Sequence, residues 1–289
     1  MHRGEVNWIL EADIVSFFDS LDRAELKKML QIRVADGSLM RLIGKCLLVG
    51  ILAGAQYSEP EFGAVQGSVL SPLLGNIYLH YVLDQWFESV VKPRLRGKAS
   101  LIRYADDFAI GFELEADARR VMDVLPQRMA KYHLALHPDK TCLFEFRRPP
   151  KQQQGGKGGT SFDLLGFTFY WARARTGRWG MACKARSASL RRAIKSIYDW
   201  CRSHRHLSIQ DQHKALARRL RGHYNYFGVS GNSRRLQHFT EAVRRIWLKW
   251  LQRRSQRHRL NWQRYDVLLK TRWALPRPRI VVKIWGAAP

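Results

Sequence analysis

Two adjacent carboxylates, Asp106 and Asp107, lie between two short apolar runs in the stretch LIRYADDFAIGF, residues 101–112. Two strands joined by a tight turn would hold both acids at the tip of a hairpin. The carboxylates repel each other unless a positive group lies beside them. A divalent metal ion is the obvious candidate, although adjacent acids on a turn are often simply solvated.

The chain before and after this hairpin mixes strand and helix patterns. Residues 8–18 predict a strand with Asp13 near its C-terminal end. Residues 134–146 predict a strand pair broken by a turn at Pro138. Helices are predicted at 22–30, 38–52, 71–90 and 115–132. Asp22 caps the first of them and forms a capping box with Glu25. Ser71 is the predicted N-cap of the third, with Pro72 in its first turn. This mixture favours an α+β domain with helices on one face of a sheet.

On such a sheet, Asp13 could lie beside the hairpin that carries Asp106 and Asp107. Three carboxylates there could hold two Mg²⁺ ions about 3.5–4 Å apart, the arrangement used for in-line phosphoryl chemistry. Mg²⁺ prefers oxygen ligands and stays partly hydrated, which leaves places for substrate phosphates. We therefore take these three acids as the candidate metal ligands, with Mn²⁺ as a substitute ion.

The positive charge is concentrated in the last two-fifths of the chain. Residues 1–170 hold 21 Lys and Arg against 20 Asp and Glu, whereas residues 171–289 hold 29 against 4. A block with so little acidic compensation indicates a polyanionic partner, most commonly nucleic acid. Disorder is the alternative, but aromatic residues and leucines recur throughout the block. It predicts helices at 186–203, 208–221, 233–255 and 261–271, after a domain boundary near residue 172.

Other sequence features narrow the setting. The four cysteines are far apart and form no C-x-x-C pair, which argues against a zinc site or a disulfide framework. No apolar run reaches the ~18 residues of a membrane span. The first ten residues lack the apolar stretch of a signal peptide. We expect a cytoplasmic protein.

Several motifs in chain order resemble the reverse-transcriptase palm. Among reverse transcriptases, they are most similar to those of group II intron-encoded proteins. They are DIVSFFD from Asp13, QGSVLSPLLGNIYL from Gln66, YADD from Tyr104, LALHPDKT and LLGFTF. The resemblance continues into LRGHYNYFGVSGN, WLKWLQRRSQ and LPRPRI, which are similar to the maturase-specific thumb, or X, domain. It implies a right-hand polymerase palm over residues 1–172 and an all-α basic thumb over residues 173–289.

The resemblance also implies roles for matching residues. Asp13 and Asp106 would be the principal metal ligands and Asp107 the third acid. Lys140 would act as a general acid for pyrophosphate or as a charge neutraliser, although a surface lysine after a turn would look the same. Phe18 would be the steric gate that excludes a 2′-hydroxyl, with Phe17 in the core. Further nucleotide contacts would come from Ile14, Gln66, Gly67, Tyr104 and Ala105, and the primer grip from Leu165, Gly166 and Phe167.

The helical part combines arginines with aromatic and polar side chains. Arginines bind phosphates and aromatic rings stack on unpaired bases, a pattern suited to structured RNA. Phe227 and Trp250 are expected in the core. The predicted RNA-binding residues are Arg218, Arg219, Arg221, His223, Tyr224, Asn225, Arg253, Arg254 and Arg257, with Arg259 on the same basic face.

The sequence departs from this family at both ends. Only twelve residues precede Asp13, so we expect the fingers to be missing and the polymerase activity of the isolated chain to be weak or absent. No C-terminal endonuclease is expected. The chain could be a truncated frame, half of a split protein completed by a partner chain or by a second copy, or a remnant that binds RNA without using its acids.

The expected function is RNA-directed DNA synthesis by a group II intron reverse transcriptase/maturase. The expected partners are group II intron RNA, an RNA template with a DNA primer, and deoxynucleoside triphosphates, with no membrane. The alternative is a non-catalytic maturase that binds intron RNA and assists splicing. A nucleotide cyclase with a palm-like fold would not explain the basic block or the Gln66-Gly67 motif.

Overall fold

The computed structural model describes residues 6–48, 51–53, 56–58, 70–150, 157–173, 177–254 and 260–283. The chain forms two compact units, residues 1–153 (unit 1) and 154–289 (unit 2). Their net charges are +1 and +25. The division comes earlier than the charge step near residue 172, because the strands after it pair with one another in a sheet of their own. Gln66, Gly67, Arg257 and Arg259 lie outside the described residues.

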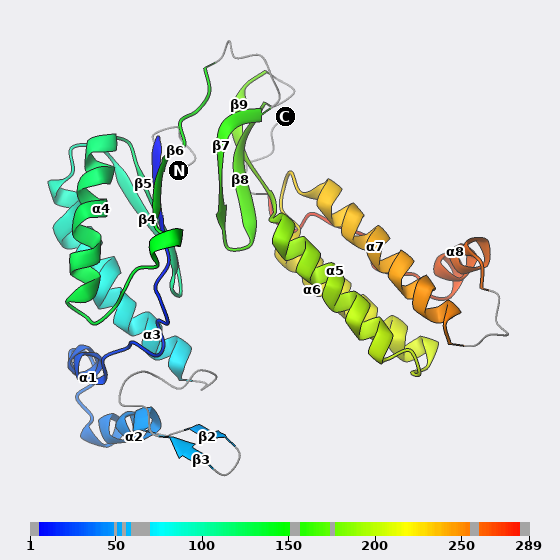
Figure 1. The fold of residues 1–289 in the computed structure, drawn as a ribbon, viewed down its shortest axis with the longest axis horizontal. Helices are drawn as coiled ribbons and strands as arrows, with labels where there is room; N and C mark the ends of the chain where they lie inside the picture. Colours follow the sequence, from blue (N-terminus) through cyan, green and yellow to red (C-terminus); the bar gives the residue numbers. More distant parts are fainter. Residues whose placement is uncertain are drawn as a thin grey trace. The chain divides into compact units, whose positions relative to one another are not determined.

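A four-stranded sheet forms the frame of unit 1 (Figure 1). Its antiparallel strands follow the order β4 (Ala99–Tyr104), β5 (Asp107–Phe112), β1 (Trp8–Ala12) and β6 (Cys142–Glu145). Strand β1 is therefore central and is paired on both edges. The strand predicted at 8–18 ends at Ala12, because the backbone turns where the amides of Asp19 and Ser20 both bond the carbonyl of Ser16.

Helices pack against this sheet and close the core of unit 1. They are α1 (Arg23–Gln31), α2 (Gly37–Leu48), α3 (Ser71–Leu79) and α4 (Glu115–Ala130), and a small hairpin of β2 (Ile51–Ala53) and β3 (Gln56–Ser58) follows α2. Figure 1 shows α3 and α4 on the same face of the sheet. Core residues from strands and helices pack together there, among them Leu10, Phe108, Phe112, Leu26, Tyr78 and Leu125. Helices α1, α2 and α4 each have an apolar face, whereas α3 is apolar on most of its sides.

The N-terminus of α1 follows the sequence prediction closely. The carboxylate of Asp22 accepts hydrogen bonds from the amides of Ala24 and Glu25 at 2.8 and 2.9 Å. The carboxylate of Glu25 pairs with Lys28 at 2.6 Å. Asp22 is therefore the predicted cap, whereas Glu25 is engaged in an ion pair along the helix.

The long helical segment after residue 70 is less regular than predicted. Leu70, not Ser71, is the N-cap of α3, and Ser71 is a buried first-turn residue. After α3 the segment widens into two π-helical turns, η1 (His80–Asp84) and η2 (Phe87–Val91), and ends in a 3₁₀ turn, η3 (Lys92–Arg94). Turns of this kind are rare and often occur at functional sites.

Unit 2 begins with a three-stranded antiparallel sheet. Strands β7 (Lys157–Leu164), β8 (Phe167–Arg173) and β9 (Trp179–Ala185) pair in chain order. The apolar stretch FDLLGFTFYW, residues 162–171, covers the end of β7 and most of β8. The dipeptide Leu165-Gly166 within it forms the turn of a hairpin, with φ of +51° and +76° at the two residues. Positive φ at both positions is what a two-residue type I′ hairpin turn requires.

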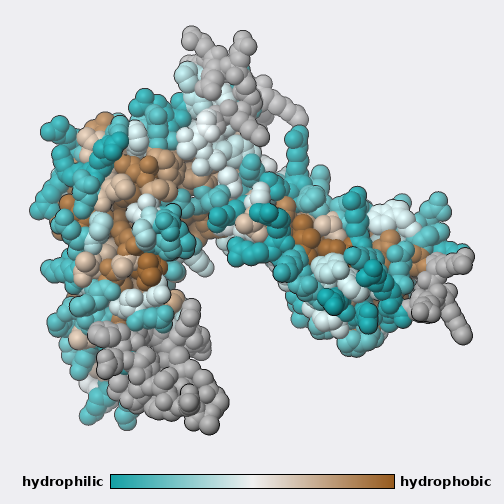
Figure 2. All heavy atoms as spheres, viewed as in Figure 1, coloured by the Kyte–Doolittle hydropathy of each residue, from teal (hydrophilic) through white to brown (hydrophobic). Residues whose placement is uncertain are grey.

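Four helices complete unit 2, close to their predicted positions. They are α5 (Ser187–Ser203), α6 (Ile209–Phe227), α7 (Ser233–Gln252) and α8 (Trp262–Thr271). Their shared core includes Leu216, Tyr224, Phe239, Trp247 and Tyr265. Figure 2 shows hydrophilic residues over these helices, with an apolar band between them. No helix in the described part of the chain is long and apolar enough to cross a membrane.

Candidate active site and nucleic-acid interface

The pairing of β1 with β5 brings Asp13 beside the acidic hairpin. Ala12 is opposite Phe108 in the antiparallel register, so Asp13 leaves β1 where Asp107 enters β5. Asp13 is half-buried and the side chain of Asp107 is exposed. Two residues 94 positions apart therefore meet at one end of the sheet. The sequence predicted this meeting from the position of each acid on its strand.

A tight hairpin presents the other two predicted residues. Tyr104 is paired with Asp107, which leaves Ala105 and Asp106 as a two-residue turn between β4 and β5. Ala105 has φ of +54°. A residue with a Cβ occupies this left-handed region at a cost on the order of 1–3 kcal/mol. The predicted hairpin is confirmed, and its turn holds Asp106 directly before Asp107.

The segment 134–141 brings Lys140 to Asp13. The amide of Val15 donates to the carbonyl of Ala135, and the amide of His137 donates to the carbonyl of Asp13, both at 2.8 Å. A short 3₁₀ helix, η4 (Pro138–Lys140), follows. The ammonium of Lys140 then bonds Oδ2 of Asp13. Lys140 is thus part of the acidic cluster, which favours its predicted role over that of an isolated surface lysine.

The charges of these four residues influence one another. Partial desolvation raises the pKa of Asp107, and the carboxylates of Asp106 and Asp13 raise it further, while Lys140 opposes the shift. The hydrogen bond and charge of Asp13 raise the pKa of Lys140, and Asp107 and Asp106 add to the effect. The cluster therefore contains a protonated lysine. It also contains a carboxylate, Asp107, whose ionised form would be stabilised by any further positive charge nearby.

The donor types suit a hard cation, but the side chains do not form a ready ligand set. Three carboxylates supply the oxygen ligands that Mg²⁺ prefers. Within the described residues, no three His, Cys, Asp or Glu side chains are gathered as metal ligands. The ammonium of Lys140 takes a cation's place at Asp13. Asp13 could hold a metal ion only after this ion pair rearranges.

The predicted nucleotide-binding residues of unit 1 differ in exposure. Tyr104 exposes 70% of its surface and is free to meet a ligand. Phe17 is buried in the core as predicted, and Phe18 is half-buried against that core, 5.2 Å from Phe17 between ring centres. Ile14 is 4% exposed and belongs to the core. The prediction of a nucleotide contact is therefore wrong for the side chain of Ile14, because its apolar surface is already buried.

The predicted primer-grip residues of unit 2 lie on the β7–β8 hairpin. The hydroxyl of Tyr226 donates to the carbonyl of Leu165 at 2.9 Å, and the amide of Arg186 donates to the carbonyl of Gly166 at 2.8 Å. The rings of Phe167 and Tyr226 stack with centres 5.7 Å apart. The hairpin is thus attached to α6, and the sequence LLGF is a turn rather than a plain core strand.

Among the predicted RNA-binding residues that the structure describes, the arginines and Asn225 are exposed. Arg218, Arg219 and Arg221 are exposed on α6, and the guanidinium of Arg219 lies 5.0 Å from the centre of the Trp200 ring. Arg253 lies 5.3 Å from the ring of Trp250, which is buried as predicted. These cations lie on aromatic surfaces and still face solvent. They remain available to phosphates.

Two of the predicted RNA contacts belong to the core instead. Tyr224 is 1% exposed and shares a 2.5 Å hydrogen bond with Thr240, so an RNA contact by its ring is wrong. The ring of His223 stacks on Phe239 with centres 3.8 Å apart, and burial lowers its pKa to about 4. A neutral, packed imidazole offers no charge to a phosphate. Both side chains pack against α7, whereas Asn225 and Tyr226 of the same HYNYF stretch are exposed.

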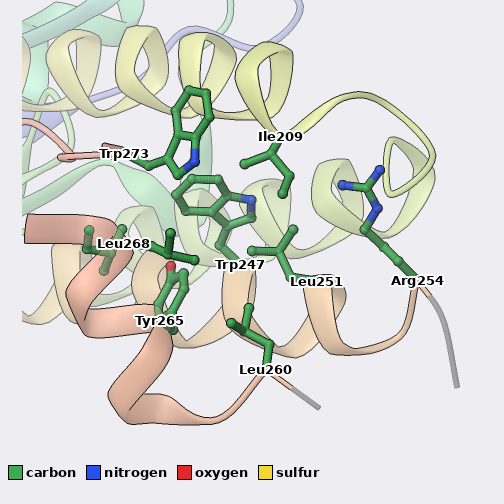
Figure 3. Close-up of a pocket in the computed structure, with 9 residues that line it drawn as sticks. Ile209, Trp247, Leu251, Arg254, Leu260, Tyr265, Leu268 and Trp273 are labelled. Carbon is green, nitrogen blue, oxygen red and sulfur yellow. The ribbon is translucent and has the colours of Figure 1, made fainter. Parts of the chain in front are cut away.

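Arg254 lies at an apolar hollow of unit 2 with a volume of about 290 Å³. Figure 3 shows Trp247, Trp273 and Tyr265 around it, with the guanidinium of Arg254 at one side. This hollow could not be predicted from the sequence, because its walls come from α6, α7, α8 and the segment after α8. Its apolar lining is continuous with the core of unit 2.

A family of known proteins matches the part of the chain that contains the acidic hairpin. The model of the reverse transcriptase (RNA-dependent DNA polymerase) family matches residues 1–169. The chain belongs to this family. Its match covers all of unit 1 and extends into strand β8 of unit 2.

Relatives of this chain include intron-encoded proteins. The group II intron-encoded protein LtrA of Lactococcus lactis subsp. cremoris is 40% identical over 77 residues, 27% of this chain and 13% of LtrA. A 91 kDa protein in the cob intron of Schizosaccharomyces pombe is 39% identical over 83 residues, 29% of this chain and 10% of that protein. The predicted resemblance to group II intron-encoded proteins is confirmed, while the chain spans only a small part of their length.

A telomerase structure from Candida albicans also aligns with this chain. The alignment covers 91% of this chain and 46% of that chain, with a TM-score of 0.46 and 13% identity. The mixed helix-and-sheet fold expected for the family is present in unit 1.

One residue of the reverse-transcriptase hairpin was missed by sequence reasoning. Arg103 precedes the YADD motif and bonds both Asp84 and the backbone of the turn. Arg103 is the only charged residue of the predominantly apolar strand β4, and this was the one sequence feature that could have indicated its role. Its partner Asp84 could not be found from sequence, because the π-helical turn that places it breaks the ordinary helical periodicity.

Proposed function

We propose that the chain is the palm, residues 1–172, and the RNA-binding thumb, residues 173–289, of a group II intron-encoded reverse transcriptase/maturase. Its reaction is RNA-directed DNA synthesis from deoxynucleoside triphosphates. The observation that carries the proposal is the meeting of Asp13, Asp106, Asp107 and Lys140 at one end of the sheet. Nothing in the stability of a sheet requires three carboxylates at this point, since their mutual repulsion is unfavourable.

The acids would hold two Mg²⁺ ions in this proposal. When bound, the ions would activate the primer 3′-hydroxyl and stabilise the leaving pyrophosphate. Lys140 would leave Asp13 and face the developing negative charge. Its raised pKa keeps it protonated at neutral pH, so it serves as charge neutraliser or as proton donor to pyrophosphate.

Other residues would position the substrates. Phe18 would pack on the sugar of the incoming nucleotide and exclude a 2′-hydroxyl. Gln66 and Gly67 would contact the same nucleotide. Exposed Tyr104 and the turn residue Ala105 would lie near the primer end. Leu165, Gly166 and Phe167 would grip the primer through the β7–β8 hairpin. Positioning of this kind supplies much of the rate enhancement in phosphoryl transfer.

Unit 2 would bind RNA through its exposed arginines. Its net charge of +25 provides strong, salt-dependent attraction to phosphates. The contacts would come from Arg218, Arg219, Arg221, Arg253, Arg254 and Arg257, with Asn225 among them. We place this unit in a cytoplasmic intron ribonucleoprotein.

Primer extension on an RNA template tests the polymerase proposal. We expect weak but measurable nucleotide incorporation with Mg²⁺ or Mn²⁺, which Asp106→Asn abolishes. Asp123→Asn, which changes an exposed carboxylate on α4, is the matched control and should incorporate at the wild-type rate. Incorporation by the wild-type chain no greater than that of Asp106→Asn would contradict the proposal.

The charge distribution favours a second candidate, a maturase that binds intron RNA without polymerising. It predicts tight RNA binding by an Asp106→Asn variant and loss of binding when Arg218, Arg219 and Arg221 are changed to Ala. Binding that weakens steeply with salt is expected for both candidates. Absence of incorporation together with tight RNA binding would favour this second function.

A further inference from the structure

The guanidinium of Arg103 joins the acidic turn to the neighbouring helical segment. Its Nε and Nη2 donate to the two oxygens of Asp84 at 2.7 and 2.6 Å. Its Nη1 donates to Oδ1 of Asn76 and to the carbonyl of Ala105, both at 3.0 Å. Four of its five N–H donors are therefore used in one arrangement.

This arrangement is partly buried and geometrically specific. The side chain of Arg103 is 11% exposed and that of Asp84 is 29% exposed. A two-pronged guanidinium–carboxylate pair fixes both planes, and lysine cannot reproduce it. The pair is therefore more than a screened surface contact.

The helical segment supplies the fixed side of the arrangement. Asn76 lies on α3, and Asp84 is the last residue of the π-helical turn η1. Tyr78, Val82 and Leu83, on the same segment, are fully buried in the core of unit 1. Asn76 and Asp84 are thus held by core packing, and Arg103 transmits that rigidity to the sheet end.

The other side of the arrangement is the turn between β4 and β5. The carbonyl that Arg103 holds belongs to the peptide joining Ala105 to Asp106. Ala105 is in the left-handed region, a conformation that needs support from its surroundings. The carboxylate of Asp84 neutralises the charge of Arg103. The hydrogen bond from Arg103 to the carbonyl of Ala105 therefore affects the orientation of the turn more than the electrostatic potential at the two acids.

We propose that Arg103 is the positioning residue of the acidic turn: held by Asp84 and Asn76, it fixes the Ala105–Asp106 peptide and so the direction in which Asp106 and Asp107 face Asp13. This inference rests on the proposed polymerase function for its catalytic consequence. Arg103 touches no reacting atom in this role. It acts through the backbone that carries the two acids.

The test compares Arg103→Gln and Arg103→Lys with Arg119→Gln in the full chain. Arg119 pairs with Glu115 on the exposed surface of α4, so its variant removes an ordinary surface ion pair. We expect both Arg103 variants to lower kcat for nucleotide incorporation by about 10- to 100-fold, with KM for the nucleotide within about twofold of wild type. Amide hydrogen exchange at Asp106 and Asp107 should become faster. Arg119→Gln should change neither quantity.

The lysine variant separates positioning from charge and from folding. Arg103→Lys keeps the positive charge beside Asp84, so its Tm should stay close to wild type while kcat remains low. Rescue of kcat by lysine, or unchanged amide exchange at the turn in both variants, would overturn the inference. If the wild-type chain shows no incorporation, the polymerase proposal fails, and the exchange measurement still decides the role of Arg103.

Discussion

The packing of His223 predicts a specific loss of stability in mild acid. Burial lowers the pKa of its imidazole from 6.5 to about 4 in the folded chain. Below about pH 6.5 the unfolded chain binds a proton at this residue, and the folded chain does not until the pH approaches 4. The contribution of His223 to stability is therefore complete above pH 6.5 and is lost as the pH falls toward 4.

The size of the effect follows from the two pKa values. Linkage gives a ceiling of about 2 kcal/mol lost between pH 7 and pH 5. His223 is only half-buried, so solvent screening reduces this to about 1–2 kcal/mol. The variant His223→Phe keeps an aromatic ring against Phe239 and removes the titrating group. It should gain about 1–2 kcal/mol relative to wild type when the pH is changed from 7 to 5.

Urea denaturation followed by tryptophan fluorescence measures this difference. Eight of the ten tryptophans belong to unit 2, so the signal reports mainly on the unit that contains His223. His238→Gln is the matched control, because His238 is exposed on α7. Equal pH dependence of wild type and His223→Phe would refute the account of a packed, neutral imidazole. RNA affinity should be unchanged in His223→Phe.

Three substitutions in unit 1 test other parts of the structure by urea denaturation. Gly75→Ala should cost about 1 kcal/mol net, since its Cβ would lie 2.8 Å from Cε1 of Phe17 and helix propensity recovers only part of the loss; a gain in stability would contradict this packing. Ala105→Gly should stabilise unit 1 by up to about 1 kcal/mol, because glycine relieves the positive φ; a loss would show that the turn is unstrained. Asp117→Ala should cost about 3 kcal/mol or more, since the buried carboxylate accepts hydrogen bonds from the amides of Arg96 and Gly97; a cost below 1 kcal/mol would count against that role.

The acidic cluster could be predicted from the sequence because each part carries a local signal. Asp13 ends an apolar run, and Asp106 and Asp107 interrupt two such runs. Antiparallel pairing of the strands then brings them together at one sheet end. The helices of unit 2 could also be predicted from the sequence, since apolar residues recur in them with a period of 3.6 residues.

Other features depend on tertiary contacts and left little trace in the sequence. Whether Tyr224 faces RNA or the core is decided by Thr240 on α7, which lies 16 residues away. The strand β9, Trp179–Ala185, mixes small, polar and aromatic residues and is stabilised by pairing with β8. The Arg103–Asp84 pair depends on a π-helical turn, which changes the face that Asp84 presents.

Binding of Mn²⁺ alone, followed by electron paramagnetic resonance, tests most directly the claim that acids from distant segments form one site. Wild type should bind the ion, and Asp13→Asn and Asp107→Asn should each weaken binding at least about tenfold, while Asp123→Asn should bind like wild type. Equal Mn²⁺ affinity in wild type and both cluster variants would contradict a shared metal site and remove the basis for a polymerase centre in this chain.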